Sequence, residues 1–412
     1  MNFYLLIILS FYILFFLIDT IVDILNVKHI QTELPEEFKA VYDSEKYQKS
    51  QEYLRECTRF SLIKSSFNLL VTVPFIVLGG FNLVDQLSRQ FNFSSIVTGL
   101  LFFGLLSLGS FVIDIPFSLF STFVIEKKYG FNKTTFSTFV IDILKSLLLS
   151  VVIGAPILAL ILWFFESNGA NAWLYCWLAL TAIQIVLMFV APILIMPLFN
   201  KFEPLEEGEL KTSILDYAKK ENFSLKGLFT MDGSKRSTKS NAYFTGFGQF
   251  RRIVLFDTLI KNHSVNELLT IVAHEMGHYK KKHIFKMIVV SIISSGFMFF
   301  ILSLFLNNAL LFEAFKMDHI SVYASLVFFS FLYSPIETIL SVFSNISSRK
   351  HEFEADAYAV DTTNLHKDLV SGLKKLSVDN LSNLSPHPLK VFLEYSHPPV
   401  LERIKAINAL NK

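Results

Sequence analysis

Seven long apolar stretches constrain the fold of this 412-residue chain more than any other feature. A helix needs about 20 residues to cross a bilayer, and backbone groups in lipid must form their hydrogen bonds within the segment. We therefore expect transmembrane helices over residues 3–26, 61–83, 97–125, 139–166, 171–199, 284–312 and 319–346. Only 17% of the residues are charged, whereas a soluble domain is near a quarter charged. The predicted fold class is a mainly α-helical, polytopic membrane protein.

Lysine and arginine are distributed unevenly among the connections between these stretches. The connection 27–60 is rich in both, and the next connections alternate between basic and nearly uncharged. Because basic loops stay in the cytoplasm, this alternation predicts an outside N-terminus and cytoplasmic segments 200–283 and 347–412. The first stretch lacks a basic leader and a small-residue cleavage site, which favours a retained helix. The net charge of +2 gives no reason to expect nucleic acid as a partner.

The chain therefore divides into four parts. Residues 1–199 hold five transmembrane helices, 200–283 the first soluble part, 284–346 a transmembrane hairpin and 347–412 the second soluble part. Since both soluble parts lie on one side of the membrane, we expect them to fold into one domain. The first part contains a polar, helix-like run, "EEGELKTSILDYAKKE", two short strands in "GLFTMDG" and "RRIVLFD", and a hairpin turn in "TGFGQF".

A metal-binding motif lies at the end of the first soluble part. Ser264 and Glu267 form a capping-box pattern, so a helix is expected to begin there. Residues four apart share a helix face, which points His274 and His278 the same way, with Glu275 beside them. This H-E-x-x-H pattern is typical of zinc peptidases, in which the glutamate takes a proton from water. The alternative is a chance match on a charged amphipathic helix.

A third zinc ligand is expected in "SSRKHEFEADAYAV", a predicted helix at the start of the second soluble part. Glu352 and Asp356 are four apart and share a face. The simplest interpretation makes Glu352 the ligand and Asp356 the acceptor that fixes a histidine tautomer. From spacing alone, Glu354 or His351 could replace Glu352, and the run could also be an ordinary acidic helix.

Two further groups of residues are weaker candidates. His397 and Arg403, in the tail, could stabilise the oxyanion of a tetrahedral intermediate, although a lone histidine before two prolines is more often structural. The segment that contains Asn241, Ala242 and Tyr243 lies beside a predicted strand, where an extended substrate could add to the sheet edge. An ordinary hairpin is the simpler interpretation of that segment.

Charged residues within the apolar stretches support a different class of function. Asp114, Asp142 and Glu337 could line a polar path in a transporter or channel. Glu275 distinguishes the two classes, because a transporter has no use for it. A pseudoenzyme that binds without cutting is disfavoured, since every residue that the peptidase chemistry requires is present.

The ordered motifs "IEKKYGFNKTT", "GSKRSTKSNAYFTGFGQFRRIVLFDTLI", "AHEMGHYKKKH", "SSRKHEFEADAYA" and "YSHPPVLERI" span almost the whole chain. With them, the sequence resembles the type I CAAX prenyl endopeptidase family of membrane zinc metallopeptidases. The resemblance implies seven helices around a large water-filled chamber, capped by a split α+β metallopeptidase domain with one Zn²⁺. It implies that His274, His278 and Glu352 bind the zinc and that Glu275 is the general base. Asp356 falls on an aspartate directly outside the shell of metal ligands, and Asn241 lies in the segment that lines the substrate cleft. His397 and Arg403 fall on residues that approach the active centre.

The same resemblance implies a peptide substrate with a prenylated CAAX C-terminus or a similar hydrophobic segment. A general membrane-protein quality-control protease with the same zinc chemistry is the alternative. Lys239 departs from the histidine of some relatives, and the compact loops suggest a bacterial member. The membrane is then expected to be a bacterial inner membrane, or the endoplasmic reticulum in a eukaryote.

Overall fold

The membrane-spanning part consists of seven long helical segments. The computed structural model describes residues 2–246 and 251–410, and within these ranges seven helices are long and apolar enough to cross a membrane. This confirms the predicted number of spans. They are α1 (Phe3–Lys28), α2 (Ser44–Val77), α4 with the π-helix η2 (Ser95–Glu126), α5 to α6 (Phe136–Ser167), η4 to η6 including α7 (Gly169–Leu198), α11 (His283–Phe305) and α13 (Val322–Thr363).

Several helices differ from the expected boundaries, and among them α11 ends at Phe305, before the expected residue 312. Helix α2 begins at Ser44, well inside the connection expected at 27–60, and the short helix α3 (Gly80–Arg89) extends from the end of the span expected at 61–83 into the next connection. Helix α13 continues without a break from the membrane to Thr363, so the expected boundary at 346 falls inside one helix. Hydropathy detects contact with lipid, whereas a helix ends where its backbone hydrogen bonds end.

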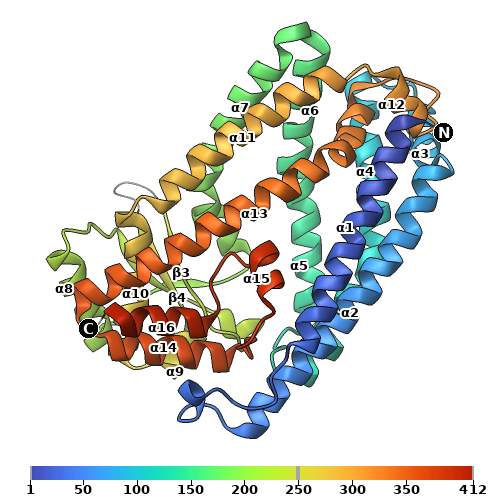
Figure 1. Cartoon of the computed structure of the whole chain (residues 1–412). Helices are drawn as coiled ribbons and strands as arrows, with labels where there is room; N and C mark the ends of the chain where they lie inside the picture. The colour runs from blue at the N-terminus through green and yellow to red at the C-terminus, as the bar shows by residue number, and fades with distance from the viewer. Residues whose placement is uncertain (1, 247–250, 411–412) are drawn as a thin grey trace.

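Most of the residues in the apolar spans are not buried by other parts of the chain. In each span, at most 17% of the most apolar window is buried within the chain. Figure 1 shows α1 and α2 on one side and α7 and α11 on the other, with α13 slanting between them. The short helix α12 (Ala309–Ala314) closes the turn between α11 and α13 at the end far from the soluble domain. The chamber that the resemblance implies stays a prediction.

A four-stranded sheet forms one layer of the soluble domain. Its order is β1 (Phe202–Pro204), β2 (Gly227–Met231), β4 (Arg252–Phe256) and β3 (Ala242–Thr245), which confirms the two strands expected in "GLFTMDG" and "RRIVLFD". Strand β2 is parallel to β4, and β3 pairs with β4 antiparallel, from Ala242 opposite Leu255 to Thr245 opposite Arg252. Strand β3 is therefore at an edge. Residues 247–250 of the expected turn lie outside the described part of the chain.

Six helices complete the soluble domain. They are α8 (Glu209–Lys220), α9 (Asp257–Asn262), α10 (Val265–Lys280), α14 (His366–Asp379), α15 (Pro388–Glu394) and α16 (Val400–Leu410). One hydrophobic cluster contains buried residues from both soluble parts, among them Leu255, Val272, Leu373 and Ile407. The two parts therefore share a core, and the lower half of Figure 1 shows their elements interleaved.

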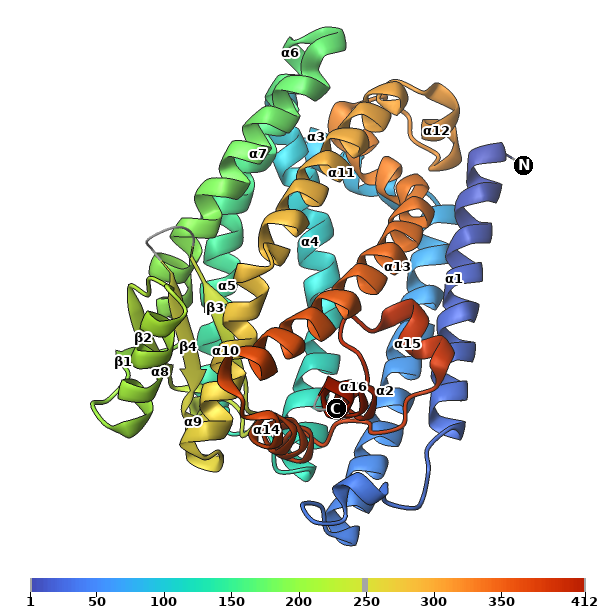
Figure 2. The same cartoon turned by 60° about the vertical axis from the view of Figure 1, so that its left-hand side comes forward.

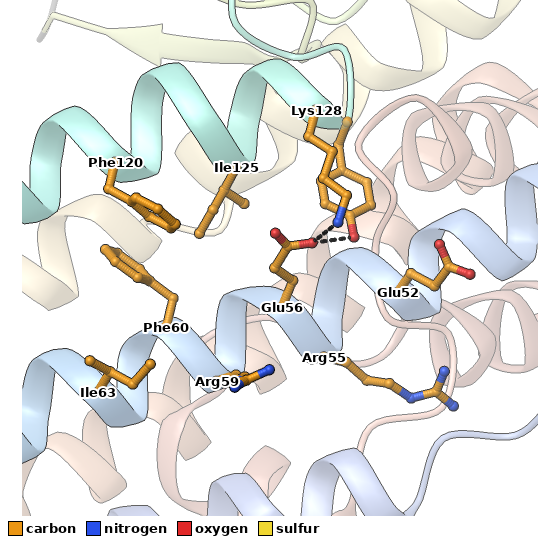
Figure 3. A pocket seen from close by; sticks show the side chains of 10 residues that line it. Glu52, Arg55, Glu56, Arg59, Phe60, Ile63, Phe120, Ile125 and Lys128 are labelled. Atoms are coloured by element: carbon orange, nitrogen blue, oxygen red, sulfur yellow. Dashed lines mark hydrogen bonds and ion pairs between the residues drawn. The ribbon is translucent and has the colours of Figure 1, made fainter.

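Charged side chains near the span ends connect the helices to one another and to the soluble domain. Asp142 of α5 forms a bidentate pair with Arg236, with nitrogen–oxygen distances of 2.7 and 2.9 Å. Figure 3 shows Glu56 of α2 accepting hydrogen bonds from Lys128 and Tyr129 beyond the end of η2.

Asp114, which was a candidate for a transport path, pairs instead with Lys64 at 2.8 Å. Asp142 is likewise bound to Arg236. Two of the three carboxylates in the expected path therefore have a cation as partner. These pairs tie neighbouring elements together, which is a structural use of intramembrane charge.

Candidate active site

Helix α10 presents the two histidines of the motif on one face. Its first turn is fixed by a reciprocal capping box, in which Ser264 N donates to Glu267 at 2.8 Å and Glu267 N donates to Ser264 at 3.3 Å. Two and three turns later, the Nε2 atoms of His274 and His278 lie 3.1 Å apart. The predicted helix start and the shared face are both present in the structure.

Helix α13 crosses α10 at very close range beside these histidines. The close approach occurs at Gly277, where an added Cβ would lie only 3.2 Å from the Ala355 Cα and carbonyl oxygen and 3.1 Å from Tyr358. A glycine is needed here because a side chain would hold the two backbones apart. Helix α13 packs against α10 here (Figure 2), and its residues Glu352 and Asp356 contact the motif histidines.

Three potential ligand atoms converge at this crossing. The Glu352 carboxylate oxygens lie 3.4 Å from His274 Nε2 and 3.2 Å from His278 Nε2, and all three donors fall within 4.8 Å of one another. Bonds of about 2.0–2.1 Å in a tetrahedral zinc site separate ligand atoms by about 3.3 Å. Within the described chain, buried Glu352 Oε2 accepts no hydrogen bond and has only an ion-pair contact with Arg403 besides the histidine. Two imidazoles and a carboxylate at these spacings fit a zinc ion.

A buried ion pair lies behind the ligands. Asp356 Oδ1 is 2.9 Å from His274 Nδ1, the position expected for an acceptor that fixes the tautomer. Arg403 donates to both oxygens of Asp356, at 2.8 and 2.6 Å, and its Nη1 lies 3.2 Å from Glu352. Because these donors are directed at two carboxylates, Arg403 is placed to neutralise the site. The oxyanion-stabilising role expected from the sequence stays a prediction.

Burial shapes the proton affinities of this cluster. Burial disfavours a charged imidazole, but hydrogen bonds to Asp356 and Glu352 outweigh it and raise the pKa of His274 to about 9. Burial raises the pKa of the Glu275 carboxyl, with the positive charge of the neighbouring histidines opposing it. A carboxyl whose pKa moves toward neutrality is better matched to accept and return a proton.

The remaining candidates lie at the rim of the site. His397 Nε2 is 3.5 Å from Glu352 Oε1, and its side chain is 67% exposed, so it reaches the ligands from the solvent side. Asn241 directly precedes the edge strand β3, and its side chain accepts from Ala242 N at 2.8 Å. Tyr243 is half-buried on that strand. The structure therefore brings His397 to Glu352 and places Ala242 and Tyr243 on the edge strand of the sheet, with Asn241 directly before it.

The structure also separates the three candidates for the third ligand. Glu354 faces away from the ligand cluster and contacts His283 at 2.9 Å. The His351 ring stacks on His283 with centroids 4.0 Å apart. Of the three, Glu352 is the one whose side-chain donor atoms lie beside both motif histidines. The sequence analysis did not identify His283, because no partner for it was evident in the pattern. It also did not identify Gly277, although a glycine between the two motif histidines could have indicated a close helix contact.

Comparisons with known proteins agree with this geometry. A family model described as the CAAX prenyl protease N-terminal, five membrane helices, matches residues 23–201, and the model of peptidase family M48 matches residues 204–411. The chain belongs to peptidase family M48. It is a multi-pass membrane metallopeptidase of the CAAX prenyl protease 1 group, as the resemblance predicted.

The relatives cover nearly the whole chain. CAAX prenyl protease 1 of Saccharomyces cerevisiae is 35% identical over 93% of this chain and 90% of its own length. The Homo sapiens homologue is 33% identical over 92% and 90%. The crystal structure of S. mikatae Ste24p superimposes with a TM-score of 0.94 at 35% identity, covering 98% of this chain and 99% of that one. All three relatives are eukaryotic, so the suggested bacterial origin has no support.

Proposed function

We propose that this metallopeptidase is zinc-dependent and cleaves peptides with a prenylated CAAX C-terminus on the cytoplasmic face of a membrane. The observation that carries the proposal is the cluster of His274, His278 and Glu352. Glu275 directly follows His274 on α10. The names of the relatives supply the substrate class. The alternation of connections rich in lysine and arginine with connections that have almost none supports the cytoplasmic orientation, and the eukaryotic relatives favour the endoplasmic reticulum.

The donor set fits zinc better than the other common divalent ions. Imidazole nitrogens suit zinc, whereas magnesium and calcium prefer oxygen ligands in larger shells. His274, His278 and Glu352 would hold the ion and leave a fourth position open. A zinc ion held there supplies Lewis acidity, which polarises a carbonyl and lowers the pKa of water.

Glu275 is the proposed general base. Its carboxylate takes a proton from the attacking water as the new carbon–oxygen bond forms, and returns that proton to the amide nitrogen as the carbon–nitrogen bond breaks. The raised pKa of Glu275 suits both transfers. His397, exposed beside Glu352, is the group placed to donate a hydrogen bond to the developing oxyanion. Arg403 acts through Asp356 and Glu352, whose charge it neutralises.

Strand β3 is the proposed binding edge for the peptide. It is the outermost strand on its side of the sheet, and it packs against α10, which carries the motif. A substrate backbone could therefore add as a further strand along Ala242 and Tyr243, with Asn241 at the end of that edge. The main-chain pairing would be sequence-tolerant, so recognition of the lipid must come from elsewhere in the chain.

The test is cleavage of a farnesylated CAAX peptide by the purified full-length protein in detergent. Wild type is compared with Glu275→Gln, and zinc content is measured in both, with the unlipidated peptide as the matched substrate. We expect cleavage of the farnesylated peptide by wild type alone and zinc in both proteins. Zinc with equal cleavage of both peptides would favour the quality-control protease. Absence of zinc from both proteins would contradict the metal centre itself.

A further inference from the structure

We propose that His283 and Glu354 form a hydrogen-bonded chain that fixes the tautomer and orientation of His278. The inference rests on the proposed zinc site and assigns a positioning role to two residues outside the motif. His283 Nδ1 lies 3.1 Å from His278 Nδ1, and His283 Nε2 lies 2.9 Å from Glu354 Oε2. The contacts run in an unbroken line from the ligand cluster to a carboxylate on α13.

The direction of each hydrogen bond follows from the chemistry of the imidazole ring. His278 Nε2 faces the other two ligand atoms, at 3.1 Å from His274 and 3.2 Å from Glu352, so a bound metal requires its lone pair. A neutral imidazole then carries its proton on Nδ1. That proton can only be donated to His283 Nδ1, which must be unprotonated. The His283 proton therefore resides on Nε2 and is donated to Glu354.

The chain gives each motif histidine its own carboxylate. His274 reaches Asp356 directly at 2.9 Å, and His278 reaches Glu354 through one neutral imidazole. Metal-binding histidines in proteins almost always donate their second ring nitrogen to such a partner, which holds the ring and raises its basicity. Without His283, the Nδ1 proton of His278 would have no acceptor among the contacts that the described residues make with it.

The local backbone explains how His283 reaches this position. Helix α10 ends at Lys280 and α11 begins at His283, so only two residues connect the helices. Lys282, in this turn, has a φ of 60°, which is unusual for a residue with a side chain. Such strain of about 1–3 kcal/mol persists only where the surrounding structure imposes it. The turn places a fully buried imidazole, 1% exposed, beside the ligand on the preceding helix.

A purely structural role for His283 is the competing explanation. Its ring stacks on His351 with centroids 4.0 Å apart and an interplanar angle of 13°. Both rings are buried, so either one could matter only for packing. The two histidines differ in hydrogen bonding: His283 uses both nitrogens, whereas His351 Nδ1 is buried without a partner in the described chain. His351 is therefore a matched control for packing.

The experiment measures zinc affinity by competition with a chelator at fixed pH, together with the thermal unfolding midpoint of each metal-free protein. The variants are His283→Phe, which keeps the stacked ring without nitrogens, and His283→Asn, whose Oδ1 takes the place of Nδ1 as acceptor. Glu354→Gln keeps an acceptor but removes its charge, and His351→Phe is the packing control.

We expect zinc affinity to fall about 10–100-fold in His283→Phe and to be largely restored in His283→Asn. Glu354→Gln should show a smaller loss, and His351→Phe should bind zinc as wild type does. Equal affinity of His283→Phe and wild type would overturn the inference, as would an equal loss in the Phe and Asn variants. These outcomes do not depend on peptide cleavage. Wild-type protein that binds no zinc would overturn the proposed function and the inference together.

Discussion

Replacing Gly277 by alanine tests whether the close approach of α10 and α13 builds the metal site. Alanine in a helix interior is more favourable than glycine by about 1 kcal/mol, so propensity alone predicts a more stable protein. The added Cβ, however, would lie 3.1–3.2 Å from Tyr358 and from backbone atoms of Ala355. Ordinary van der Waals contact of a Cβ needs about 3.5–4.0 Å.

The clash should outweigh the gain in helix propensity. The Tyr358 side chain could rotate away, but the Ala355 Cα and carbonyl oxygen are backbone atoms of a 42-residue helix and can move only if that helix moves. Overpacking of this kind costs about 1–3 kcal/mol, so Gly277→Ala should be no more stable than wild type and up to about 2 kcal/mol less stable. Zinc affinity should fall too, because α13 would carry Glu352 outward and metal–ligand distances tolerate only about 0.2 Å.

Gly372 of α14 provides the control. A Cβ there would meet its nearest atoms at 3.6 Å, which is ordinary contact, so Gly372→Ala should gain stability of about 0.5–1 kcal/mol. Thermal unfolding in detergent, with zinc content measured in parallel, should order the midpoints Gly372→Ala, wild type, Gly277→Ala. If both alanine variants were stabilised equally and kept their zinc, the close approach at Gly277 would not be what positions the ligands.

Three further changes test the charges around the site. Arg403→Met leaves the two buried carboxylates of Asp356 and Glu352 without their cation and should lower the stability of the metal-free protein by about 3–5 kcal/mol. Added zinc should restore part of this stability. Equal losses with and without zinc in thermal unfolding would contradict this prediction. Burial raises the pKa of Glu267, but the hydrogen bonds from Lys375, Ser371 and Ser264 N together outweigh it and hold that pKa below its usual range. The stability that Glu267 contributes is thus present at neutral pH and lost as pH falls. Glu267→Gln should therefore destabilise the protein by about 1–3 kcal/mol at pH 7 and by little below about pH 4. A decrease of the unfolding midpoint that is the same at both pH values would refute this prediction. Arg236→Met removes the bidentate pair with Asp142 and should loosen the soluble domain from α5, seen as faster limited proteolysis; unchanged cleavage would show that the pair is dispensable.

The sequence by itself determined what depends on neighbours along the chain. Uncharged runs of about 20 residues must be helical in lipid, so the number of spans could be predicted. The capping box at Ser264 and the spacing of His274 and His278 follow from the period of one helix. The pattern around Glu352 likewise put Asp356 on the same face. Each of these inferences needs only residues within a few turns of one another.

Contacts between distant elements were decided by the tertiary structure. Spacing alone left Glu352, Glu354 and His351 as possible third ligands, because the choice depends on how α13 crosses α10 at Gly277. His283 had no partner pattern in the sequence, since its neighbours His278 and Glu354 come from two other helices. Helix α13 also runs past the boundary expected at residue 346, because its backbone hydrogen bonds continue where its high hydropathy does not. Local periodicity determines the direction in which a side chain points from its own helix. Only the packing of the helices determines which residues of other elements that side chain contacts.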